Sequence, residues 1–164
     1  MSVNSILKAI AQRVLEFTQQ VYGDRLLSLV VYGSLGRGRV NYFSDIDLLI
    51  VARTLPKGRL RRVGEFEEIE SRVAGFIKEA ERYGVFTRLS PIFKTKEEVL
   101  RGSPLFLDMI DDAIILYDRE DFFSSYLDRL RDRLGKLGAR RVRQGTRWYW
   151  ILKPDYKPGE IFEI

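Results

Sequence analysis

The chain has 164 residues, of which 45% are hydrophobic and 31% charged, a composition typical of one soluble globular domain. It contains neither cysteine nor histidine, which excludes disulfide frameworks, thiolate or imidazole metal sites, thiol nucleophiles and Ser-His-Asp triads. Any acid–base or metal chemistry must therefore rest on carboxylates, with Lys or Tyr as lesser options. The net charge of +5 favours an anionic partner such as a nucleotide or nucleic acid, although a solvated basic surface explains it equally well.

The hydropathy of the chain bears on its location. No apolar run reaches the roughly 20 residues that span a bilayer, and the start of the sequence shows no signal-peptide pattern. We therefore expect a cytoplasmic protein. Abundant ion-pairing residues and the lack of cysteine also resemble a thermophile composition.

Hydrophobic periodicity and turn residues divide the chain into alternating helices and strands. The predicted elements are helices over 4–22, 60–83 and 123–137, short helices starting at Thr95 and Ser103, strands over 26–32, 44–52, 85–93 and 113–117, and one or two strands after Arg140. This order predicts an α/β (α+β) fold, a single domain whose mixed central sheet of about four to five strands is flanked by helices. Residues 1–93 would form its core, and residues 94–164 would complete the same domain with helices, strands and a basic aromatic tail.

The stretch from Leu29 to Val51 carries the clearest chemical signal. A buried strand ends in Gly33-Ser34, ten residues intervene, and Asp45-Ile46-Asp47 opens the next strand. Because side chains alternate along a strand, the two carboxylates share a face and can share hard divalent cations such as Mg²⁺. A glycine directly after a strand lets backbone approach a ligand closely, so its N–H groups and the Ser34 hydroxyl can hold phosphate oxygens. One end of this site would bind phosphate and the other metal.

This joint pattern is not a P-loop or a dinucleotide-binding fingerprint, because it lacks the Gly-Lys-Ser/Thr ending of the first and the third glycine of the second. The sequence instead resembles the DNA polymerase β-type nucleotidyltransferase superfamily. The resemblance rests on Val30–Ser34 and Ser44–Ile50, about twenty-five residues in all with their spacer. Arg37-Gly38 is similar to the Arg-Gly of small prokaryotic members, the minimal nucleotidyltransferases.

The resemblance implies a two-metal transfer of a nucleotidyl group from an NTP such as ATP. Asp45 and Asp47 would hold two Mg²⁺ ions, and Gly33 and Ser34 would hold the β,γ-phosphates. Two arginines of the intervening loop, Arg37 and Arg39, would balance the triphosphate charge or remain solvated.

The acceptor stays open, because family members act on nucleic acid ends, small molecules or protein hydroxyls. Small prokaryotic members also serve as antitoxins that adenylylate a HEPN-type toxin partner. A homo-oligomer is a further expectation left open by the sequence.

Active family members usually carry a third carboxylate on a neighbouring strand. The strand expected over 85–93 has none, and its polar residues are Thr87, Arg88 and Ser90. Glu97 and Glu98 are already explained by the capping box that begins at Thr95. The alternatives are therefore slower chemistry, a carboxylate from elsewhere, or a catalytically weak relative that binds nucleotide or RNA.

The basic tail allows two interpretations. The indoles of Trp148 and Trp150 would stack on bases while nearby arginines follow phosphates, or the aromatic residues would fill a core or a subunit interface. The sequence alone favours packing, and it leaves the role of the tail open.

Overall fold

The computed structural model describes all residues, 1–164, and its centre is a four-stranded mixed sheet with the strand order β3-β2-β1-β4. The strands are β1 (Leu26–Tyr32), β2 (Ile46–Ala52), β3 (Leu89–Thr95) and β4 (Ile114–Asp118). β2 runs antiparallel to β1 and parallel to β3, and β4 pairs antiparallel with β1. The predicted fold class, a mixed sheet within a single domain flanked by helices, is confirmed.

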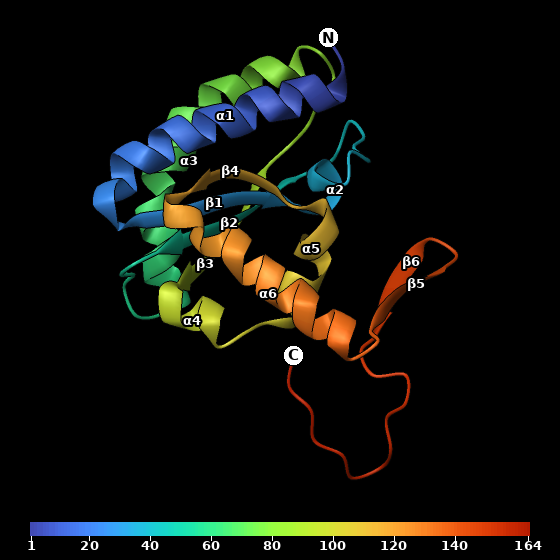
Figure 1. Cartoon of the computed structure of the whole chain (residues 1–164). Coiled ribbons are helices and arrows are strands. Elements are labelled where there is room, and N and C mark those ends of the chain that lie inside the picture. Colours follow the sequence, from blue (N-terminus) through green and yellow to red (C-terminus); the bar gives the residue numbers. More distant parts are fainter.

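Two long helices, α1 (Val3–Tyr22) and α3 (Arg59–Glu81), lie side by side over one face of the sheet (Figure 1). They pack on alternate residues of β2, among them Ile46, Leu48 and Ile50. On α3 the side chains of Phe66, Ile69 and Val73 are fully buried, whereas Phe76 is 40% exposed. The helix predicted over 60–83 is thus confirmed, at Arg59–Glu81.

The other face is covered by the helices that follow β3 (Figure 1): α4 (Lys96–Leu100), α5 (Met109–Asp112) and α6 (Phe122–Lys136), with the 3₁₀ turn η2 (Pro104–Asp108). Their side chains meet Val30, Leu49 and Val51 in a second hydrophobic cluster. Because β1 and β2 are buried on both faces, they read in the sequence as nearly continuous apolar runs.

The third strand differs from its prediction, since β3 begins at Leu89 instead of residue 85. The segment before it is held by other contacts: Phe86 N donates to the Tyr42 carbonyl at 2.7 Å, and Ile46 N donates to the Arg88 carbonyl at 2.9 Å. Pro91 lies inside β3, which is an edge strand, as its missing N–H requires.

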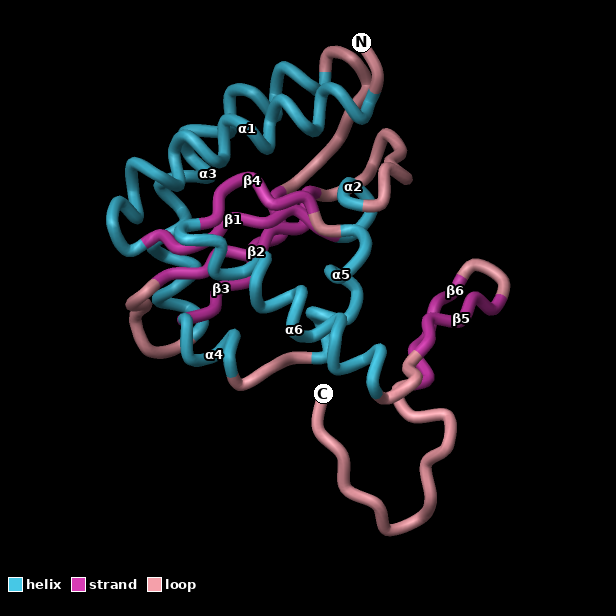
Figure 2. The backbone as a smooth tube through the Cα atoms, in the orientation of Figure 1, coloured by secondary structure: helices cyan, strands magenta, loops and turns pink.

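The chain ends in a hairpin, β5 (Arg140–Gln144) and β6 (Arg147–Ile151), and an extended segment. This pair forms a separate two-stranded sheet and does not join the central one (Figure 2). None of the helices combines the length and apolar character that a membrane span requires.

Candidate active site

The predicted phosphate-binding turn and the predicted metal-binding carboxylates meet at one end of the central sheet. β1 ends at Tyr32, Gly33 and Ser34 begin the one-turn helix α2 (Gly33–Gly36), and Tyr32 pairs with Asp47 in the antiparallel register. Gly33 has φ +65°, and a Cβ there would overlap the Asp47 carboxylate, lying 2.9 Å from its Cγ. Only glycine permits this approach. Residues fourteen positions apart in the sequence are thus in direct contact.

The loop before β2 fixes the position of Asp45, which lies directly ahead of the strand. The Ser44 hydroxyl accepts a hydrogen bond from Asn41 N at 2.8 Å, and the Thr87 hydroxyl donates to the Ser44 carbonyl at 2.8 Å. Ser44 and Thr87 are both buried. These hydrogen bonds join the segments before β2 and β3 at Ser44, the residue that precedes Asp45. They fix the backbone position of Asp45.

The electrostatics of Asp47 are those of a carboxylate enclosed by protein. Burial raises its pKa, and the nearby Asp45 charge raises it further, whereas the Ser90 hydroxyl and the Arg37 charge lower it. The phenol of Tyr32 responds in the same way: burial and the Asp47 charge raise its pKa to about 12. Negative charge is thus concentrated here and only partly compensated by protein groups, which favours a bound cation.

Of the candidate arginines, Arg37 is the one whose charge acts on Asp47. Arg37 and Arg39 are both exposed on the loop after α2, where Arg39 N donates to the Ser34 carbonyl at 2.9 Å. A further arginine approaches from the residue that precedes β3: Arg88 Nη2 lies 3.5 Å from Asp45 Oδ2. The Arg88 side chain is 85% exposed and this contact is long, so it is weak and can move aside.

On β3, the strand next to the two carboxylates, no acidic side chain lies beside Asp47. In the parallel register of β2 and β3, Asp47 pairs with Ser90. Glu98 does not substitute, because it forms the capping box with Thr95 and an ion pair with Arg62. No group of three acidic residues that could hold a metal is present. Two carboxylates with oxygen donors still fit a divalent ion that completes its shell with water and phosphate oxygens, as Mg²⁺ does.

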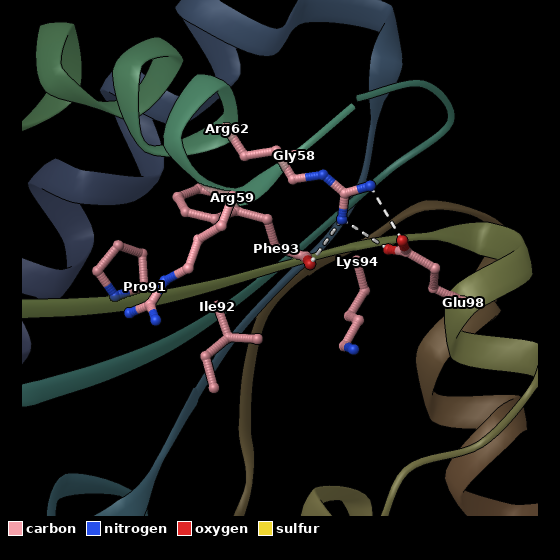
Figure 3. A pocket seen from close by; sticks show the side chains of 8 residues that line it. All are labelled: Gly58, Arg59, Arg62, Pro91, Ile92, Phe93, Lys94 and Glu98. Carbon is pink, nitrogen blue, oxygen red and sulfur yellow. Dashed lines mark hydrogen bonds and ion pairs between the residues drawn. The ribbon is translucent and has the colours of Figure 1, made fainter. Parts of the chain in front are cut away.

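A pocket of about 540 Å³ lies elsewhere, along the outer edge of β3 (Figure 3). The guanidinium of Arg62 closes one side of it by binding both Glu98 oxygens at 2.8 and 2.9 Å and the Phe93 carbonyl at 3.3 Å. None of the predicted site residues lines this pocket. A second hollow, of about 490 Å³, adjoins the predicted site, because Thr87 and Arg88 line it.

A stacked pair of aromatic side chains next to the carboxylates is not among the predicted site residues. Phe43 and Phe86 stack with their ring centroids 5.7 Å apart, and they are 75% and 49% exposed. Phe43 stands two residues before Asp45. Two aromatic residues side by side in a loop, Tyr42 and Phe43, are the sequence signal for this feature. Their sequence does not predict that Phe86, more than forty residues away, is the stacking partner of Phe43.

Comparison with known proteins identifies the family. A family model described as a nucleotidyltransferase domain matches residues 11–147 of the chain. The chain belongs to the nucleotidyltransferase domain family. This confirms the resemblance to the polymerase β-type superfamily that the Gly-Ser and Asp-x-Asp pattern indicated.

The chain also has relatives among individual proteins. One is "Putative protein adenylyltransferase MJ1305" of Methanocaldococcus jannaschii, 30% identical over 145 residues, a match that spans 87% of this chain and 93% of the relative. Among solved structures, a toxin–antitoxin with AMP-PNP aligns at TM-score 0.43 and 15% identity, covering 77% of this chain and 92% of the other. A tri-AMPylated Shewanella oneidensis HEPN toxin in complex with MNT antitoxin aligns at TM-score 0.40 and 12% identity, covering 80% and 92%. The sequence matches decide the family.

Proposed function

We propose that this nucleotidyltransferase moves AMP from ATP to a hydroxyl group of a partner protein in an Mg²⁺-dependent reaction. The acceptor hydroxyl would lose its proton to water as its oxygen attacks the α-phosphorus, while the bond to the bridging oxygen breaks and pyrophosphate leaves. Asp45 and Asp47 would hold the metal, which supplies positive charge to the reacting phosphate when bound. Gly33 and Ser34 would hold the β,γ-phosphates, with Arg37 and Arg39 beside them.

The observation that carries the proposal is the contact between Gly33 and Asp47. It brings the predicted phosphate-binding turn against the predicted metal-binding carboxylates, so that a triphosphate and its cations could be bound together. The raised pKa of Asp47 agrees with a site built to receive positive charge. The name of the Methanocaldococcus jannaschii relative supports a protein as acceptor and an adenylyl group as cargo.

A second candidate function is nucleotide binding without efficient transfer. It is favoured by Ser90, which occupies the position beside Asp47 where a third carboxylate would help to deprotonate the acceptor. A hydroxyl with an ordinary alcohol pKa does not act as a general base at neutral pH. On this alternative, the site would bind ATP and Mg²⁺ but turn over slowly or not at all.

The first experiment is a calorimetric titration of non-hydrolysable ATP with and without Mg²⁺, on the wild type and on the double variant Asp45→Asn/Asp47→Asn. We expect Mg²⁺-dependent binding that the double variant loses while its circular dichroism spectrum stays unchanged. Equal binding by both proteins would refute the assignment of the two carboxylates.

Transfer is tested separately by incubating the protein and a cell lysate with ATP labelled at the α- or the γ-phosphate. Label that enters protein from the α-position alone, and that protease but not nuclease releases, supports adenylylation of protein. Label released by nuclease would make nucleic acid the acceptor. Mg²⁺-dependent binding without any incorporation would support the second candidate function.

A further inference from the structure

The C-terminal hairpin is a basic, aromatic arm that the nucleotidyl-transfer site does not use. β5 and β6 are joined by a two-residue turn whose first residue, Gly145, has φ +62°, as a tight hairpin requires. The tip of the hairpin stands away from the central sheet (Figure 2). An isolated two-stranded hairpin is marginally stable in water, so its base needs an anchor.

That anchor is an ion pair beside the nucleotide-binding turn. Arg141 Nη1 lies 3.0 Å from Asp112 Oδ2, and its side chain is only 15% exposed. Asp112 ends α5, whose backbone touches α2: a Cβ on Gly36 would overlap the Asp112 carbonyl oxygen. Trp150, in the same half of the hairpin, packs against the second hydrophobic cluster. The base of the arm is therefore fixed next to the candidate active site.

The outer half of the hairpin presents cations and an indole together. Arg143 pairs with Trp148 across the strands, and the guanidinium carbons of Arg141 and Arg143 lie 4.6 and 5.6 Å from the centre of the Trp148 ring. Trp148 remains 39% exposed, and Arg140, Arg143 and Arg147 are exposed as well. The interpretation that these aromatic residues fill a core is therefore wrong for Trp148.

The hairpin strands themselves carry only positive charge. From Arg133 to Lys153 the chain carries seven basic residues and no acidic one. The neighbouring acidic residues of α5 are engaged, since Asp111 and Asp112 both approach Arg141. The outer half of the arm thus keeps its positive charge uncompensated.

We propose that the outer half of this hairpin binds single-stranded nucleic acid, with Trp148 stacking on a base and the exposed arginines contacting phosphates. The phosphates of a nucleic acid would neutralise the exposed arginines. Its unpaired bases would stack on the Trp148 indole, which the neighbouring guanidinium groups hold in place. Protein interfaces are also enriched in Trp and Arg, but Arg140, Arg143 and Arg147 are exposed and form no ion pair, and nucleic-acid interfaces are wet and strongly positive. This binding needs neither ATP nor metal, so it stands apart from the proposed transfer.

The chain offers a direct optical test, because both of its tryptophans, Trp148 and Trp150, are in β6. An oligo-uridylate of twelve nucleotides should quench the tryptophan fluorescence. Adding the protein to the same oligonucleotide labelled with fluorescein should raise the anisotropy of the label. Three exposed arginines predict that log K falls against log salt concentration with a slope of about −2. Trp148→Ala should weaken binding about tenfold or more, and Trp148→Phe should restore most of it.

Two paired variants separate this arm from general basicity. Arg143→Gln/Arg147→Gln should reduce the salt slope to about −0.7. The matched control Arg13→Gln/Arg72→Gln removes the same charge from arginines that lie over Phe76 and Phe17, and it should leave binding unchanged.

The double variant Asp45→Asn/Asp47→Asn should bind the oligonucleotide like the wild type, which separates this result from any failure of nucleotidyl transfer. Equal affinity for poly-glutamate without quenching would overturn the proposal in favour of an acidic protein partner. Equal loss in the control pair, or no binding at 50 mM salt, would also overturn it.

Discussion

The contact between Gly33 and Asp47 leads to a quantitative prediction for Gly33→Ala. The added methyl group would lie 2.9 Å from the Asp47 Cγ and 3.3 Å from its Cβ, and it would overlap one carboxylate oxygen. The Asp47 side chain is short, so it can yield only by changing rotamer or by shifting β1 against β2. That displacement costs about 1–3 kcal/mol, and a non-glycine residue at φ +65° adds about 1–2 kcal/mol. We expect a total loss of about 2–5 kcal/mol in the free energy of unfolding.

The assay combines chemical denaturation with calorimetric titration of non-hydrolysable ATP in Mg²⁺. Because the methyl group displaces a predicted metal ligand, nucleotide affinity should fall at least about tenfold. Gly38→Ala is the matched control: Gly38 has φ +66°, but nothing lies within 4 Å of its added Cβ. It should lose only the backbone contribution, about 1–2 kcal/mol. If both variants lose the same stability and both keep nucleotide affinity, the reasoning about Asp47 is refuted.

Three further predictions concern charged groups. The pKa of Asp47 is raised in the folded state, so at a pH above its unfolded-state pKa the ionised carboxylate destabilises the fold. Asp47→Asn should therefore be more stable than the wild type at pH 7.5 in EDTA. This gain should vanish near pH 3, where the carboxyl group is protonated in both states. The Arg62 guanidinium lowers the pKa of Glu98, so this pair stabilises the fold at neutral pH and ceases to do so as the pH falls through the folded-state pKa of Glu98. Thermal melts of Glu98→Gln should show that the free energy of unfolding falls by about 1–2 kcal/mol at pH 7 and is unchanged at pH 2. Asp118 accepts hydrogen bonds from the buried Ser28 hydroxyl at 2.7 Å and from two backbone N–H groups at the start of α6 at 2.9 Å; Asp118→Ala should cost about 2–4 kcal/mol in denaturant titrations, and a loss below 0.5 kcal/mol would contradict this role.

Elements set by local patterns were predictable from the sequence. The continuous apolar run of β1 gave its bounds, Leu26–Tyr32, because that strand is buried on both faces. The capping box at Thr95 was confirmed, since both of its hydrogen bonds are made within four residues. The predicted start of β3 is four residues early, because Val85, Phe86 and Thr87 are residue types that favour strands, but this segment binds the loop before β2 instead.

The candidate site divides in the same way. The spacing of Gly33 and Asp47 could be read from the sequence, but their contact depends on the register of β1 against β2. The sequence identifies Ser90 as a polar residue of the third strand. Its place beside Asp47 follows only from the parallel pairing of β2 with β3. The Phe43–Phe86 stack joins segments more than forty residues apart. Each of these features is a long-range pairing, which local periodicity does not encode.

The energetics of Asp47 explain why its surroundings are arranged as they are. A carboxylate enclosed by β1, β2 and α2, with a second carboxylate two residues away, is a costly arrangement for a protein without a cation. A fold selected for stability alone would place an apolar residue there, as it does two and four residues further along β2 at Leu49 and Val51. The fold instead has a carboxylate at this position, and a glycine at position 33 leaves the space that the carboxylate occupies. Destabilising features retained against such alternatives are typical of functional sites, which is the physical reason to look for ATP and Mg²⁺ here first.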